Sequence, residues 1–155
     1  MDAIASVVLP SVLGADAQRV ALERFLEWAD AFEPVAELNH GYGTSEIRYG
    51  PADPRPGWAA QLAALDLEAR HRFDTSFPEL ELEERTALVR DHLERVVDGP
   101  GMASPERAPH VAAALMAHWF RSSEATDLCY EVSIERLSCR GIETAPQRPA
   151  ALERG

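Results

Sequence analysis

The sequence predicts an all-α protein, a compact bundle of about five or six helices with one long irregular loop. Its best patterned stretch, residues 58–97, holds two helical segments joined by a short apolar corner at residues 73–78. Asp66 is expected to cap a second short helix within the first segment. In the second segment, residues that recur at steps of three and four share one side of a helix; they are Leu82, Thr86, Val89, Leu93 and Val96. A strand would scatter them over both faces, so we expect a helical hairpin.

Start and stop signals predict the N-terminal helices. Residues 4–9 form a short apolar helix or turn, which Pro10 ends. A longer helix over residues 17–32 begins after Asp16, a good N-cap, and is stopped by Pro34. Its wide apolar face is typical of a helix packed against two neighbours; it consists of Ala21, Leu22, Phe25, Leu26, Trp28, Ala29 and Phe32.

Two further helices are predicted towards the C-terminus. Residues 104–106, Ser-Pro-Glu, combine an N-cap serine, a proline at the first helical position and an acid in the first turn. The helix that they begin is expected to reach about residue 121, with its regular part delayed by Pro109. A last helix, capped by one of the serines at residues 122–123, is expected to end near Gly141 as its C-cap.

Composition limits the classes of function. The 155 residues suffice for one domain with a real core, and the formal net charge is -11. Nucleic acids and anionic membrane surfaces are poor partners for such an acidic chain. No uninterrupted apolar run approaches the roughly 20 residues needed to span a bilayer, so no membrane insertion is expected. Asp2 stands where a signal peptide needs positive charge. We therefore expect a cytoplasmic protein with reduced thiols at Cys129 and Cys139, while export with a signal-bearing partner stays open.

One candidate metal-binding pattern occurs in the chain. Glu68 and His71 form a Glu-x-x-His step, the local signature of di-iron carboxylate bundles. Such sites need that step on two helices, and the chain offers it once, so these residues are weak candidates for metal ligands. His110 and His118 would lie about 12 Å apart on one helix and cannot share a metal. Since haem, zinc, dinucleotide, P-loop and esterase motifs are also missing, the sequence predicts no catalytic and no cofactor-binding residues.

Two irregular segments are the predicted partner interface. We expect one helical domain over residues 1–141, interrupted by an irregular loop at residues 38–57, and an irregular tail over residues 142–155. The loop is dense in glycine and proline, and long ordered loops often carry function. Aromatic, apolar and arginine side chains of the irregular regions are the predicted contacts: Tyr42, Ile47, Tyr49, Arg140 and Arg148.

The order of segments resembles the gluconate 2-dehydrogenase subunit 3 family, the small subunit of FAD-dependent sugar dehydrogenases. The likeness covers roughly residues 4–120. It rests on an apolar run that ends in Leu9-Pro10 and on a helix with Val20, Phe25 and Leu26. The resemblance continues through these short motifs: Leu62-Ala-Ala-Leu-Asp66, Arg72-Phe73, Phe77-Pro-Glu-Leu80, Glu84-Arg85 and Leu88. The twin-arginine signal common in that family is not present in this chain, and its aromatic-glycine ending is replaced by residues 129–132 and the tail.

The resemblance implies an all-helical accessory subunit, not an enzyme by itself, that binds and stabilises a catalytic flavoprotein of the glucose-methanol-choline type. FAD and the oxidation of a sugar or glycoside would belong to that partner, and the complex could form a homo-oligomer. Two alternatives remain open. One is a stand-alone helical metal protein or enzyme that uses the Glu68 and His71 step, and the other is a self-associating structural bundle.

Overall fold

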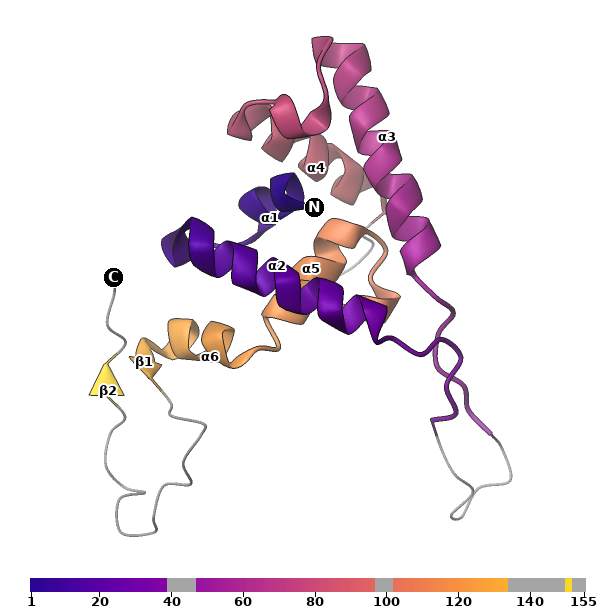
Figure 1. The fold of residues 1–155 in the computed structure, drawn as a ribbon, viewed down its shortest axis with the longest axis vertical. Coiled ribbons are helices and arrows are strands. Elements are labelled where there is room, and N and C mark those ends of the chain that lie inside the picture. Colours follow the sequence, from indigo (N-terminus) through magenta and orange to yellow (C-terminus); the bar gives the residue numbers. More distant parts are fainter. Residues whose placement is uncertain (39–46, 97–101, 134–149, 152–155) are drawn as a thin grey trace. The chain divides into compact units, whose positions relative to one another are not determined.

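Helices form nearly all the regular structure of the protein (Figure 1). The computed structural model describes residues 1–38, 47–96, 102–133 and 150–151. Over these residues it contains six α-helices: α1 Asp2–Val8, α2 Gly14–Asp30, α3 Arg55–Phe73, α4 Leu82–Val96, α5 Val111–Trp119 and α6 Ser123–Tyr130. Single 3-10 turns occur at Ser11–Leu13, Phe77–Glu79 and Pro105–Arg107. The predicted all-α class and helix number are therefore confirmed.

The chain divides into two compact units, Met1–His118 and Trp119–Gly155. The division lies inside the range predicted as one helical domain, residues 1–141. Among the described residues, nearly all the buried apolar ones belong to the first unit, from Ala3 to Ala117. The first unit therefore contains the hydrophobic core.

In the first unit, α1 packs against both α2 and α4 (Figure 1). Its Ile4 is completely buried, and Pro10 follows its C-cap Leu9, as predicted. The Gln18 side chain of α2 donates hydrogen bonds to the carbonyls of Leu9 (3.3 Å) and Pro10 (3.2 Å). These bonds satisfy backbone acceptors in the turn between α1 and α2, where the helix cannot continue.

The helix α5 is the most deeply buried element of the first unit. None of its residues is exposed, as expected for a helix surrounded by others; the buried ones of the first unit are Val111, Ala112, Ala114, Leu115 and Ala117. An aromatic cluster forms beside its last turn. The ring of Phe25 in α2 lies 5.3 Å from Trp58 in α3 and 5.6 Å from His118. The predicted delay of this helix is confirmed, since a 3-10 turn precedes it and α5 begins only after Pro109.

The corner between α3 and α4 is built from polar caps as well as apolar residues. Asp74 ends α3 in the left-handed conformation (φ 56°), and Ser76 and Glu79 form a reciprocal capping box around the next turn. The prediction that Asp66 starts a new helix is wrong, because α3 runs unbroken from Arg55 to Phe73. The Asp66 carboxylate instead accepts a hydrogen bond from the Phe77 backbone N–H (3.0 Å), at the start of the turn that follows the corner.

The buried face of α4 differs from the predicted one. Leu82 and Val96, which the pattern placed in the core, are 50% and 44% exposed. Leu88 and Val89 form the buried centre of the helix. Compared with the prediction, α4 is rotated about its axis so that His92 also faces inward and contacts Glu68. A pattern of apolar residues alone would place His92 on the solvent side.

The predicted loop at residues 38–57 is shorter and less irregular at both ends. α3 already begins at Arg55. Residues 35–38 pair with residues 48–51 through backbone hydrogen bonds, among them Leu38 N–H to the Arg48 carbonyl (2.8 Å) and an antiparallel bridge between Glu37 and Tyr49. We call residues 35–38 and 47–51 the stem.

The second unit departs from the prediction after its helix. Ser122 caps α6 as expected, since its hydroxyl accepts a hydrogen bond from the Ala125 N–H (3.1 Å). The helix ends at Tyr130, far short of Gly141, because Glu131 turns into the left-handed conformation. Val132–Ser133 (β1) then pairs antiparallel with Ala150–Ala151 (β2). Part of the predicted irregular tail is thus paired with the residues that follow α6.

Candidate functional site

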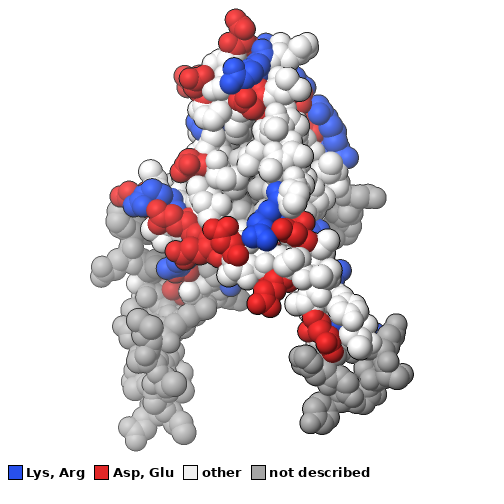
Figure 2. All heavy atoms as spheres, turned by 45° about the vertical axis from the view of Figure 1, so that its right-hand side comes forward, with Lys and Arg blue, Asp and Glu red and all other residues white. Residues whose placement is uncertain are grey.

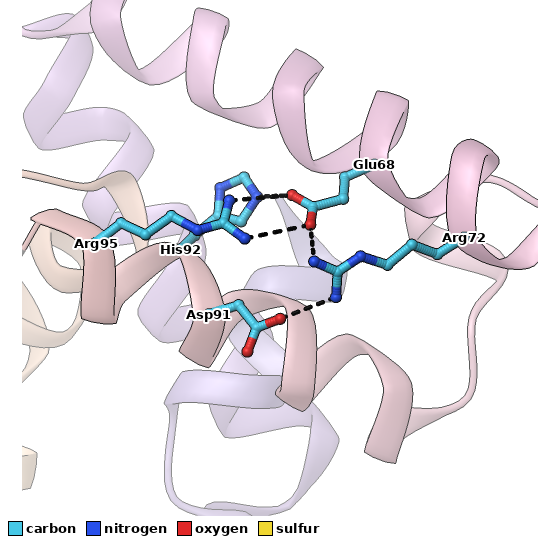
Figure 3. Close-up of polar contacts among 5 residues, drawn as sticks. All are labelled: Glu68, Arg72, Asp91, His92 and Arg95. Atoms are coloured by element: carbon cyan, nitrogen blue, oxygen red, sulfur yellow. Dashed lines mark hydrogen bonds and ion pairs between the residues drawn. The ribbon is translucent and has the colours of Figure 1, made fainter.

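The main polar cluster of the first unit joins α3 to α4 around the carboxylate of Glu68 (Figure 3). One oxygen lies 2.6 Å from His92 Nε2 in α4, and Arg95 of the same helix approaches both oxygens at 3.4 Å. Arg72, one turn further along α3, pairs with Glu68 and also donates to Asp91 of α4 (2.9 Å). Two acids and two arginines therefore bridge the arms of the hairpin, with His92 on the inner side.

The charge of Glu68 is stabilised by these neighbours. Burial opposes ionisation, but the hydrogen bonds from His92 and Arg95 and the charge of Arg72 outweigh it, so the pKa of the carboxyl is lowered from 4.5. Only 19% of the Glu68 side chain is exposed. A carboxylate held so firmly in its charged form is a poor general acid at neutral pH, and its lone pairs are already engaged.

His110 continues this cluster into the core. Its ring lies edge-on to His92, with ring centroids 5.9 Å apart, and the residue is 2% exposed. His110 is the N-cap of α5: its carbonyl accepts the N–H of Ala114 (2.9 Å) and its Nδ1 accepts the N–H of Ala112 (3.1 Å). An imidazole thus fills the role that Ser, Thr, Asp or Asn usually has at this position.

Gln61 of α3 holds the backbone on both sides of this cap. Its amide nitrogen donates to the Pro109 carbonyl (2.9 Å), and its amide oxygen accepts the Val111 N–H (2.8 Å). Two of the four N–H groups that lack a helical partner at the start of α5 are therefore satisfied by Gln61 and His110.

Burial and charge both favour the neutral form of His110. Burial lowers the pKa of its imidazole from 6.5 to about 4, and the charge of His92 contributes in the same direction. The other ring nitrogen, Nε2, is buried and has no hydrogen-bond partner among the described residues. In the neutral ring with Nδ1 as acceptor, this nitrogen carries the proton, so a donor is left unsatisfied in the core.

The two weak metal candidates from the sequence are not brought together. Glu68 faces α4 and is engaged by His92 and arginines, whereas His71 is exposed. In the part of the chain that the structure describes, no group of three His, Cys, Asp or Glu residues could hold a metal ion. Cys129 is exposed at the end of α6, and Cys139 lies outside the described residues.

The predicted interface residues are placed only in part. Ile47 and Tyr49 lie on the stem and are 52% and 60% exposed. Tyr42, Arg140 and Arg148 lie outside the described residues. Sequence reasoning missed the pair Gln61 and His110. One signal could have found them: a polar residue directly after Pro109 and directly before an apolar helix stands where N-cap residues stand.

Basic and acidic side chains alternate over the face drawn in Figure 2, with acids spread across its middle and no broad basic area among the coloured residues. Many of the charges are paired locally, for example Arg19 with Glu23 (2.7 Å) and Arg70 with Asp66 (2.9 Å). Among the described residues, no helix is both long and apolar enough to cross a bilayer.

Comparison of the chain with models of known families, with curated proteins and with solved structures finds no match.

Proposed function

We propose that this chain is a non-catalytic accessory subunit that binds and stabilises an FAD-dependent oxidoreductase of the glucose-methanol-choline type, acting on a sugar or glycoside. The resemblance of residues 4–120 to the small subunit of such dehydrogenases suggests the class of partner. In this proposal FAD and the reaction belong to the partner, and this chain supplies a binding surface.

The observation that carries the proposal is the apolar surface of the stem. Four large apolar side chains of this short two-stranded segment are more than half exposed; they are Val35 (58%), Leu38 (61%), Ile47 (52%) and Tyr49 (60%). Grouped apolar residues that a folded protein leaves in water typically mark a protein contact. Val35, Leu38 and Tyr49 lie on paired backbone, so little further ordering of these residues is needed on binding.

The backbone of the stem supports the same reading. Val35 has a positive φ of 50°, a conformation that β-branched residues rarely adopt. Its N–H donates to the Pro51 carbonyl (2.9 Å), which holds it in place. Backbone strain of this kind often lies at functional positions. A strained residue lowers the stability of the fold, so its side chain is retained there for another reason, such as binding.

Co-expression with a neighbouring flavoprotein gene tests the proposal. We expect a yellow complex that contains FAD and both chains, and we expect Ile47→Ser with Tyr49→Ser to weaken it. Leu67→Ser is the matched control, because Leu67 of α3 is 71% exposed but lies outside the stem. A colourless chain that stays monomeric beside the flavoprotein, or a complex that both sets of variants weaken equally, contradicts the proposal.

A further inference from the structure

We propose that His110 is an acid-sensitive cap of α5: its neutral imidazole holds the start of the buried helix, and its protonation releases that start. The inference goes beyond partner binding and does not depend on it. It rests on the geometry of the cap, on the groups that surround the ring, and on the unsatisfied nitrogen.

The cap works only while Nδ1 is unprotonated. A ring nitrogen accepts a hydrogen bond through its lone pair, and a protonated imidazole has two donors and no acceptor. With a proton on Nδ1, the 3.1 Å contact to the Ala112 N–H would set two donors against each other. The N–H of Ala112 would lose its partner in the core, and the helix would lose its side-chain cap.

The surroundings offer a cation at His110 no compensation. The N-terminus of a helix carries partial positive charge, so a positive ring at the cap is repelled by the helix itself. From α3, the adjacent Gln61 is uncharged and already bonded to the Pro109 carbonyl and the Val111 N–H. From α4, the nearest titratable group is His92, a second imidazole.

The charged groups that contact His92 from α3 and α4 are paired with one another. The carboxylate of Glu68 pairs with His92, Arg72 and Arg95, and the carboxylate of Asp91 pairs with Arg72. On α5 itself, the other titratable group is His118 in the last turn, beside Phe25 and Trp28 of α2 and near the charge of Arg24. In this part of the structure no acid contacts the His110 ring, so a proton there has no counter-charge in contact.

These contacts set the direction and range of the pH effect. The pKa of His110 is lowered from 6.5 to about 4 by burial and by His92. A proton therefore binds the unfolded chain more readily than the folded one, so the stabilisation is complete above pH 6.5 and is lost as the pH falls towards 4. Between pH 8 and pH 5, this one group lowers the ratio of folded to unfolded protein about thirty-fold.

Histidine is an unusual N-cap, because a residue that does not titrate would hold the helix start at every pH. Asparagine presents an oxygen at the same distance from the backbone, is one of the best N-caps and does not titrate. What histidine adds at position 110 is the ability to respond to pH.

Two substitutions of His110 distinguish the effect of its capping hydrogen bond from the effect of burying a side chain at this position. His110→Asn keeps an acceptor at the position of Nδ1, and His110→Gln moves the acceptor to the position of Nε2. Denaturant unfolding of the full chain at pH 8, 7, 6 and 5 gives the ratio of folded to unfolded protein for each variant. We expect the wild type to lose about thirty-fold more than His110→Asn between pH 8 and pH 5, and His110→Gln to be destabilised already at pH 8.

Two controls make the result specific. His118→Asn removes the other histidine with a lowered pKa and should leave the His110 contribution in place. If a variant does not fold, nitrogen NMR of the wild-type imidazoles replaces it and should show His110 with a proton only on Nε2 down to pH 5. Equal pH slopes for wild type and His110→Asn, equal behaviour of the Asn and Gln variants, or a proton on Nδ1 at pH 7 would overturn the proposal.

Discussion

At the scale of single residues, the carboxylate of Glu68 holds the two arms of the hairpin together. Its substitution Glu68→Gln leaves Arg72 and Arg95 without their shared anion and weakens the bond to His92. We expect the free energy of unfolding to fall by about 1–3 kcal/mol at pH 7, the usual range for a part-buried charged hydrogen bond. Glu94→Gln, on an exposed position of α4, is the matched control.

The same substitution has a defined pH dependence. The pKa of Glu68 is lowered below its ordinary 4.5, so its contribution is present above that pH and is lost as the pH falls through the lowered value. Denaturant unfolding at pH 7 and pH 3 should therefore show the difference between wild type and Glu68→Gln shrinking in acid. A difference that stays constant would mean that packing, not charge, connects α3 to α4.

Val35 is the second residue with a testable energetic role. Relieving its positive φ with Val35→Gly should raise the free energy of unfolding by about 1 kcal/mol, because the left-handed conformation costs a non-glycine residue roughly 1–2 kcal/mol. The neighbouring Ala36→Gly has no such strain to relieve and should lower it by about 0.5–1 kcal/mol. Thermal unfolding distinguishes the two. If both variants lose stability, the side chain of Val35 contributes more to the fold than its exposure suggests.

At the scale of elements, Gln61 fixes where α5 begins. Gln61→Ala removes the donor to the Pro109 carbonyl and the acceptor for the Val111 N–H together. We expect a loss of about 1–3 kcal/mol, with the amides of the first turn of α5 exchanging faster with solvent, because these backbone groups lie at a buried helix end.

Gln61→Glu is the graded control for this element. It keeps an acceptor for the Val111 N–H and adds a negative charge at a helix N-terminus, so it should recover part of the loss. Faster exchange spread evenly over the first unit, rather than concentrated at the start of α5, would contradict a local role for Gln61.

Several helix boundaries that depend on local signals could be predicted from the sequence, although the predicted N-cap Asp16 lies inside α2, which begins at Gly14. Pro10, Pro109 and Ser122 mark their helix boundaries correctly, because proline geometry and serine capping act within a few residues. The rotation of α4 could not be predicted, since it depends on the hydrogen bond between His92 and Glu68, which lie 24 positions apart in the sequence. The end of α6 was missed because Glu131, not a glycine, takes the left-handed conformation.

The candidate site was predictable only in fragments. Ile47 and Tyr49 stood out as apolar residues in a polar loop, and the structure leaves both exposed. Glu68 was noticed for its spacing to His71, but two of its partners, His92 and Arg95, come from another helix. The capping role of His110 depends on Gln61, 49 positions earlier, and on burial that only the assembled core provides. Long-range pairing of this kind leaves no periodic trace in one sequence.

At the scale of the whole molecule, the two units should differ in their importance for folding. Of the residues whose burial the structure describes, all the buried apolar ones except Trp119 and Ala125 lie between Ala3 and Ala117, in the first unit. A chain shortened to residues 1–121 keeps α1 to α5, the aromatic cluster and the polar contacts of Glu68, Gln61 and His110. We therefore expect it to unfold cooperatively, as judged by circular dichroism, and to retain the pH dependence assigned to His110.

The same shortened chain separates folding from the proposed partner binding. The predicted interface residues Tyr42, Ile47 and Tyr49 are retained, whereas Arg140 and Arg148 are removed. If the tail belongs to the interface, the shortened chain should fold yet bind the flavoprotein more weakly than the full chain in a pull-down at matched concentrations. Undiminished binding would assign the interface to the first unit. A shortened chain that fails to unfold cooperatively would show that residues 122–155 are needed to complete the fold.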